Sequence, residues 1–322
     1  MEKGHVVLSG TMRSGTTLMG AILNSHSKVD IVSDTLAWFF KRCAENYGPM
    51  SSEFELDDAL YSLEPFMQHY QNKYSIESLR AKVIASGISY QSLYNALIEQ
   101  ELGKSPTGLY GVKSTHAAFE YEKILRMIPN TKIIHMVRDC RDVYRSHKVF
   151  ASKKRSYLLT VLRKMALNSR TFLLRKILNR RMLLDERVFN PYHFVNPQKM
   201  IDYWAISNKL AHDLQKAHPD NILIVRYEDL IGDVPFYMRS VIDFLGVQWE
   251  EGFHDYNKLK NRDNKKWKAN SSFSKDGNNG YDNSRIGTGD RGLRAEELDY
   301  LYANASPTLD LFGYDVYRNK AS

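Results

Sequence analysis

The chain has 322 residues, of which 43% are hydrophobic and 12% aromatic, so it is long enough for one large globular domain with a sizeable core. The two cysteines, Cys43 and Cys140, form neither a metal-binding pattern nor a disulfide framework, which favours a reducing compartment. No signal peptide is visible, and no stretch approaches the ~18 uncharged residues of a membrane span. We therefore expect a cytoplasmic protein without a membrane-spanning segment.

The net charge of +8 is concentrated in one segment. Residues 153–187 contain eleven Lys or Arg and only two acidic residues, whereas the rest of the chain is almost neutral. Leu and Met recur there at helical spacing, which predicts a basic amphipathic helical insertion over residues 151–190. Such an insertion either packs on the domain as a solvated element or forms a lid or docking surface for an anionic acceptor or an anionic lipid. No nucleic-acid-binding module accompanies the charge, so nucleic acid is not an expected partner.

Short apolar runs alternate with segments of helical periodicity along the chain. Four runs predict strands, and in order they are HVVLSG at 5–10, GLYGVK at 108–113, TKIIHMV at 131–137 and NILIVRY at 221–227. Helices are predicted at 16–26, over most of 51–103, at 117–130 with a stop at Pro129, near 140–149, at 197–218, at 234–245 and at roughly 294–305. The Gly- and Asn-rich stretch 270–292 is predicted to be a long loop.

Strands that alternate with helices predict an α/β domain with a central parallel sheet flanked by helices. Ligands of such sheets bind beyond the carboxyl ends of the strands, so we expect a site where several strand ends meet. Three motifs fall at strand ends: the loop after Gly10, Arg138 after the third predicted strand, and Arg226-Tyr227 at the end of the fourth. No internal repeat divides the chain, so residues 1–322 are expected to form a single domain with helical insertions.

The loop after the first predicted strand has the glycines of a phosphate-binding loop but not its lysine. Gly10 and Gly15 stand at the spacing of a Walker A motif, and Thr16 occupies the position of the lysine. Backbone N–H groups of residues 12–17, at the start of a helix, suit a dianionic phosphate, and Arg13 adds a forked cation. The alternative is a purely structural turn between strand and helix. If the loop binds phosphate, its ligand is not held as a nucleoside triphosphate is held in a kinase.

Four motifs resemble those of sulfotransferases that use 3′-phosphoadenosine 5′-phosphosulfate (PAPS). GTMRSGTTLM resembles their 5′-phosphosulfate loop, in the form typical of the bacterial and tyrosylprotein-type branch, which has Arg in the loop. MVRDCRDVYRSH resembles their 3′-phosphate motif, with Arg138 followed eight residues later by Ser146. GVKSTHAA and VRYEDL resemble the Lys-containing segment and the segment that ends the following strand. The four matches occur in the expected order between Val6 and about Leu230.

This resemblance implies a fold, an activity and a donor. The fold is a P-loop NTPase-like three-layer sandwich, in which the helical region 51–103 lies on the acceptor side. The activity is transfer of a sulfuryl group from PAPS to a hydroxyl or amine of an acceptor such as a glycan, a lipid or a small metabolite, without a metal ion. The acceptor would be anionic if basic residues line its pocket, and residues 153–187 would then also allow peripheral contact with a membrane. A P-loop kinase or NTPase and a non-catalytic nucleotide-binding module are the alternatives.

The resemblance also implies a set of donor-binding residues. Arg13 and Thr17 would share the 5′-phosphate, and Arg138 would bind the 3′-phosphate together with Ser146, unless Arg138 only pairs with a neighbouring aspartate, Asp139 or Asp142. The full set is Arg13, Ser14, Gly15, Thr16, Thr17, Arg138, Ser146, Tyr227, Ser274, Lys275, Gly287 and Arg291. Tyr227 would either face the adenine or lie buried in the core. Trp204 and Asn208 are interpreted as structural residues.

Catalysis requires a cation for the leaving phosphate and a base for the acceptor proton. The resemblance gives Lys113 and Arg13 the first role, with an exposed strand-end lysine as the alternative for Lys113. For the base, the stretch VDIVSDTLAW lies where the tyrosylprotein-type branch has a Gly-Glu-Glu-Thr-Arg segment, and Asp34 falls on the catalytic Glu of that segment, although Asp replaces Glu here. The alternative base is His116, three residues after Lys113, which would otherwise be a histidine at a helix N-terminus without a chemical role.

Overall fold

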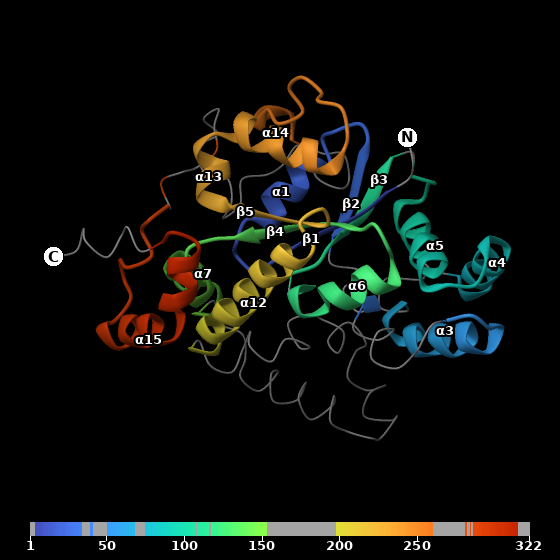
Figure 1. Cartoon of the computed structure of the whole chain (residues 1–322), viewed down its shortest axis with the longest axis horizontal. Coiled ribbons are helices and arrows are strands. Elements are labelled where there is room, and N and C mark those ends of the chain that lie inside the picture. Colours follow the sequence, from blue (N-terminus) through green and yellow to red (C-terminus); the bar gives the residue numbers. More distant parts are fainter. Residues whose placement is uncertain are drawn as a thin grey trace.

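A computed structural model of the chain shows a parallel β-sheet between layers of helices (Figure 1). The structure describes residues 4–33, 39–40, 50–67, 75–106, 108–115, 117–152, 198–259, 281, 284 and 286–314. Almost all of the predicted basic insertion, 151–190, lies outside these ranges, so that prediction stays untested. None of the helices in the described ranges is long and apolar enough to span a membrane.

The sheet has five parallel strands in the order β2-β3-β1-β4-β5. The strands are β1 (Gly4–Gly10), β2 (Val29–Ser33), β3 (Leu109–Lys113), β4 (Lys132–Val137) and β5 (Ile222–Arg226). The four predicted strands are confirmed, but the sequence analysis missed β2. This edge strand has only five residues, and its backbone is held in part by the side chain of Asn24, which exchanges two hydrogen bonds of 2.6 and 2.9 Å with Ile31. Local periodicity does not reveal such support.

One face of the sheet is covered by the helices that follow β1 and β5 (Figure 1). They are α1 (Thr16–Leu23), α13 (Tyr227–Gly232) and α14 (Val234–Leu245). Asp233 caps α14 by accepting a hydrogen bond from the Phe236 N–H, and Gly246 ends it in the left-handed conformation. Burial of the apolar faces of these helices against β1, β4 and β5 fixes α1 with its amino end at the carboxyl edge of the sheet.

The opposite face is covered by most of the other helices in the described ranges. The predicted helical region 51–103 is confirmed and contains α3 (Glu53–Met67), α4 (Ile76–Ser86) and α5 (Tyr90–Leu102). The others are η2 (Ala117–Glu120), α6 (Tyr121–Met127), α7 (Cys140–Ser152), α12 (Gln198–Ala217) and α15 (Ala295–Leu311), while a short turn η3 (Tyr256–Lys258) follows α14. The α15 helix packs outside this layer, on α12 and α7. Trp204 on α12 is fully buried and joins α7 and α15 in one apolar cluster. The α7 helix therefore starts at the end of β4, between the sheet and the C-terminal helix.

The last helix, α15, is longer than predicted. The sequence analysis ended it near Ala305, yet the helix continues through Pro307 to Leu311. Burial of Leu301, Ala305 and Leu309 against α12 holds the helix together across the proline, which outweighs its local cost. The helix ends in a Schellman motif, in which the N–H of Tyr314 donates to Leu309 O at 3.0 Å and Gly313 has φ +68°. This turn directs Tyr314 back toward the carboxyl edge of the sheet.

Candidate functional site

The loop between β1 and α1 is held in a conformation that only glycine fits at both ends. Gly10 has φ +144°, and a Cβ atom there would lie 2.3 Å from Met136 O; at Gly15, with φ +88°, it would lie 2.4 Å from the Tyr227 ring. The hydroxyls of the buried residues Thr11 and Ser14 are 2.6 Å apart and close the loop from inside. The N–H groups of the first turn of α1 have no intrahelical acceptor, so this end of the site suits an anion.

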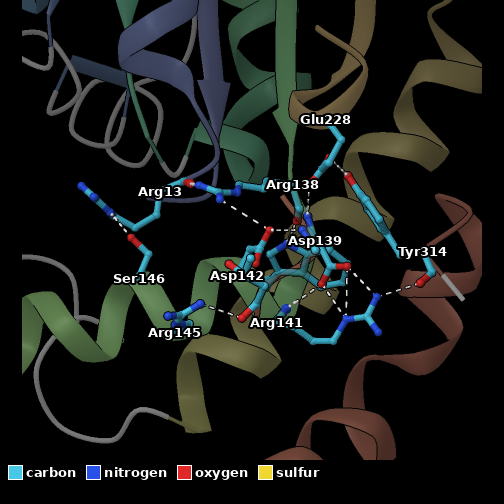
Figure 2. A network of polar contacts seen from close by, with 12 residues as sticks. Arg13, Arg138, Asp139, Arg141, Asp142, Arg145, Ser146, Glu228 and Tyr314 are labelled. Atoms are coloured by element: carbon cyan, nitrogen blue, oxygen red, sulfur yellow. Dashed lines mark hydrogen bonds and ion pairs between the residues drawn. The ribbon is translucent and has the colours of Figure 1, made fainter. Parts of the chain in front are cut away.

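The same loop contacts the α7 helix through two arginines, as Figure 2 shows. Arg13, which has φ +71°, donates from Nε to Ser146 Oγ at 2.9 Å. Arg138 follows β4 and donates from Nη1 to Arg13 O at 3.4 Å. The two predicted phosphate motifs are 125 residues apart in the chain, and these contacts bring them to one place at the edge of the sheet.

Arg138 is enclosed on several sides. Its Nη2 lies 3.5 Å from Asp142 Oδ2, which is one of the two ion pairs weighed for it from the sequence. Its guanidinium lies 4.5 Å above the ring of Tyr227, which is itself buried beneath Gly15. Burial raises the pKa of the Asp142 carboxyl, while the charge of Arg138 lowers it. A guanidinium in this setting is pre-oriented, and it is shared between a carboxylate and any anion that enters.

The described part of the predicted loop 270–292 lies on the first turns of α7. Gly287 N donates to Asp142 Oδ2 at 3.2 Å, and Arg145 donates from Nη1 to Thr288 O at 2.7 Å. Gly289 is so close to α7 that a Cβ atom there would lie 2.4 Å from the carbonyl carbon of Arg141. The loop thus brings Gly287 to the site, whereas the side chain of Arg291 is exposed.

A second polar group, which the sequence analysis did not identify, surrounds the start of α7 (Figure 2). Arg141 pairs with Asp139 through Nη2 and Oδ2 at 2.6 Å. Glu228, at the start of α13, accepts from the Asp139 N–H at 3.0 Å and from the Tyr314 hydroxyl at 2.8 Å. The sequence did contain one signal for this group, the charged residues that directly follow β4 and β5. The hydrogen bond between Glu228 and Tyr314, 86 residues further along the chain, is not visible in the sequence.

Arg138 is also connected to the core through its backbone. Trp204 Nε1 donates to Arg138 O at 2.8 Å, and Asn208 Nδ2 donates to Trp204 O at 2.7 Å. Asn208 Oδ1 accepts from His135 Nε2 at 2.8 Å, and the Tyr121 hydroxyl donates to His135 Nδ1 at 2.6 Å. Burial lowers the pKa of His135 to about 4, so its ring is neutral. Trp204 and Asn208 act as structural residues, as interpreted from the sequence.

Lys113 ends β3 and is buried, with 6% of its surface exposed, so the alternative of an exposed strand-end lysine is wrong. It pairs in the sheet with Leu8 of β1, and its Cδ lies 3.9 Å from where a Cβ atom on Gly20 would be. The side chain therefore runs along α1, which begins with the buried Thr16 and the half-buried Thr17.

Four predicted site residues lie outside the described residues. They are the two candidate bases, Asp34 and His116, and the loop residues Ser274 and Lys275. Within the described ranges, no group of three or more His, Cys, Asp or Glu side chains is arranged to hold a metal ion.

Comparison with known proteins identifies a family. A model of the sulfotransferase family matches residues 6–190 and 173–251, which is more than half of the chain. No curated protein matches the chain in sequence. The sulfotransferase domain from the curacin biosynthetic pathway has a similar structure, with 19% identity, a TM-score of 0.52 and coverage of 95% of this chain and 98% of that chain.

Two further solved structures are similar at lower scores. The sulfotransferase domain from the Synechococcus PCC 7002 olefin synthase is 17% identical over 94% of each chain, with a TM-score of 0.49. Retinol dehydratase in a complex with retinol and PAP is 14% identical over 96% of this chain and 82% of that chain, with a TM-score of 0.40. The likeness to the curacin domain shows that the chain has the α/β fold of a sulfotransferase domain.

Proposed function

Since this chain belongs to the sulfotransferase family, we propose that it transfers a sulfuryl group from PAPS to a hydroxyl or amine of an acceptor. The observation that carries the proposal is that the two segments predicted to bind phosphates meet at one edge of the sheet, joined by the hydrogen bond from Arg13 to Ser146. PAPS carries phosphates at both ends of its ribose, and two cationic segments that lie side by side match this requirement.

In the proposed complex, the loop end of the site holds the 5′-phosphate. Its hydrogen-bond donors are the N–H groups of the loop and of the first turn of α1, the hydroxyls of Thr16 and Thr17, and the guanidinium of Arg13. Lys113 reaches the oxygen that bridges phosphorus and sulfur and neutralises the charge that develops there. At the other end, Arg138 and Ser146 hold the 3′-phosphate, and Gly287 and Arg291 belong to the loop that closes over the nucleotide.

The reaction we propose is a direct in-line displacement. The acceptor oxygen or nitrogen forms a bond to sulfur while the bond from sulfur to the bridging oxygen breaks. The bridging oxygen and its electron pair leave with the 5′-phosphate, and the acceptor proton passes to Asp34 or His116. Fixed cations and amides stabilise the leaving phosphate, so no metal ion takes part in the proposed mechanism. An anionic acceptor, attracted by the basic segment 153–187, completes the proposal.

Calorimetry with 3′-phosphoadenosine 5′-phosphate (PAP), the product of the donor, tests this function. We expect PAP to bind with an affinity that does not change when a chelator removes divalent ions. In a separate assay, we expect transfer of labelled sulfate from PAPS to acceptors in pooled metabolites. Binding of ATP that requires Mg²⁺, without binding of PAP, would indicate a phosphotransferase instead. Binding of PAP without transfer from PAPS to any acceptor would indicate a non-catalytic module. No binding of either nucleotide would contradict a donor site at this edge of the sheet.

A further inference from the structure

The peptide unit between Arg138 and Asp139 is held at both of its polar atoms. Its carbonyl oxygen accepts from Trp204 Nε1 at 2.8 Å, and its N–H donates to Glu228 Oε1 at 3.0 Å. All four residues are buried, with exposed fractions of 9% or less. Because a peptide unit is planar, fixing both atoms fixes the peptide plane and the position of the Arg138 Cα atom, and so restricts the direction in which the Arg138 side chain leaves the backbone.

Glu228 is in turn held by the last described residue of the chain. Its second oxygen, Oε2, accepts from the Tyr314 hydroxyl at 2.8 Å. The backbone of Tyr314 is anchored as well, because its carbonyl oxygen accepts from Arg141 Nη2 at 2.8 Å. The guanidinium of Arg226 lies 4.6 Å from the Tyr314 ring. Tyr314 is fully buried, and the Schellman motif at the end of α15 delivers it to this position.

We propose that Tyr314 and Glu228 are positioning residues for Arg138, so that the C-terminal end of α15 sets the geometry of the 3′-phosphate site. The inference rests on the proposed function, in which Arg138 binds that phosphate. In the proposed complex, neither residue binds the donor directly. Glu228 acts by holding the Asp139 N–H, and Tyr314 acts by holding Glu228.

The physical reason lies in the burial of Glu228. Without the Tyr314 hydroxyl, the buried Glu228 carboxyl loses its side-chain donor and keeps the backbone N–H groups of Asp139 and of Glu228 itself, a loss that is costly for a buried polar group. The carboxylate then turns toward another donor or toward water, and the Asp139 N–H loses its acceptor. Arg138 must match a phosphate with a planar fork, and small displacements of such a group weaken binding markedly.

The test compares two nucleotides in three proteins. PAP has both phosphates, and adenosine 5′-monophosphate lacks the 3′-phosphate, so the ratio of their dissociation constants measures the 3′-phosphate contact alone. Calorimetry gives this ratio for the wild type, for Tyr314→Phe and for the matched control Tyr300→Phe. Tyr300 is on the same helix and also donates to a carboxylate, that of Asp202 at 3.0 Å. We expect Tyr314→Phe to reduce the preference for PAP about fivefold to tenfold and the control to leave it unchanged.

Glu228→Gln provides a second variant. The amide keeps an oxygen for the Asp139 N–H and places an NH₂ group beside the Tyr314 hydroxyl oxygen, so the preference for PAP should stay within about twofold of the wild type. A fall in Glu228→Gln as large as in Tyr314→Phe would overturn the inference, since charge rather than hydrogen-bond geometry would then be responsible.

The outcomes separate the inference from the proposed function. A wild type that does not prefer PAP over adenosine 5′-monophosphate contradicts the donor site itself. A wild type with that preference, which Tyr314→Phe retains or loses only as much as Tyr300→Phe does, contradicts the positioning role and leaves the function standing. Thermal unfolding of each variant verifies that it is folded. A loss of structure would weaken the binding of both nucleotides equally.

Discussion

The two ends of the candidate donor site are built in different ways. At the loop end, anion donors are backbone N–H groups whose directions follow from a strand, a glycine-bounded turn and a helix start. At the α7 end, the proposed hydrogen-bond donor to the anion is the guanidinium of Arg138, whose peptide unit with Asp139 is hydrogen-bonded to Trp204 and Glu228. The N–H groups of the loop end come from neighbouring residues. The α7 end combines four segments that are distant in the chain, namely the end of β4, α12, α13 and the end of α15. Mutations should therefore act locally at the loop end and over long distances at the α7 end.

Lys113 tests whether the loop end also supplies the charge that the reaction needs. We expect Lys113→Ala to lower kcat by about 10²–10³-fold, since the charge it stabilises develops in the transition state, and to change the KM for the donor much less. Steady-state kinetics with PAPS give both constants. Lys132→Ala is the matched control, because Lys132 begins β4 at the amino ends of the strands, opposite the candidate site, and donates to Asp220 O at 2.6 Å. An effect on KM alone would contradict the role of Lys113.

Arg138→Ala should break the α7 end and leave the loop end intact. We expect it to weaken PAP binding by about 2–4 kcal/mol, as for other truncations of a partly buried charge, with little change for adenosine 5′-monophosphate. Calorimetry with the two nucleotides measures this difference. Arg239→Ala serves as control, since Arg239 on α14 also stacks on an aromatic ring, that of Trp249 at 4.3 Å. Equal weakening of both nucleotides by Arg138→Ala would show that the two ends are not independent.

The turn at the loop end could be predicted from the sequence because its residues are neighbours in the chain. The spacing of Gly10 and Gly15 after an apolar run implied the turn, and the structure gives each glycine a conformation that a side chain would not fit. Four of the five strands were predictable for the same reason. The strand β2 was not, because its short backbone is held partly by Asn24, seven residues before the partner atom.

The α7 end could be predicted only in part. The sequence supplied Arg138 and Ser146 as a pair, yet Ser146 accepts its hydrogen bond from Arg13, on the other motif. The roles of Glu228 and Tyr314 follow from the path of α15, which continues past Pro307 because of burial against α12. Tertiary contacts of this kind leave no periodic signal, so the sequence could not indicate that the end of α15 reaches this site.

Gly15→Ala should damage the loop end by sterics. We expect it to lower the free energy of unfolding by about 2–3 kcal/mol, because the new methyl group meets the buried Tyr227 ring in addition to the strain of a positive φ. Gly103→Ala is the matched control, since Gly103 is also left-handed (φ +67°) and has no atom within 4 Å of the added methyl, so only strain of about 1 kcal/mol remains. Denaturant unfolding measures both. A Gly15→Ala protein no less stable than Gly103→Ala would contradict this prediction, since the Tyr227 ring would then move aside at no cost.

The neutral His135 belongs to the hydrogen-bonded chain that connects the α7 end to the core, and it makes the stability of the protein depend on pH. Its pKa is about 4 in the folded protein and near 6.5 in the unfolded chain, so between these values the unfolded state binds more protons. The contribution of His135 to the free energy of unfolding is therefore nearly complete above pH 6.5 and falls as the pH decreases toward 4, by about 2 kcal/mol between pH 7 and pH 5. Denaturant unfolding at these two values should show this loss in the wild type and a smaller one in His135→Gln. His218→Gln, which replaces a histidine outside this chain of hydrogen bonds, should behave as the wild type; an undiminished loss in His135→Gln would mean that the acid sensitivity arises elsewhere.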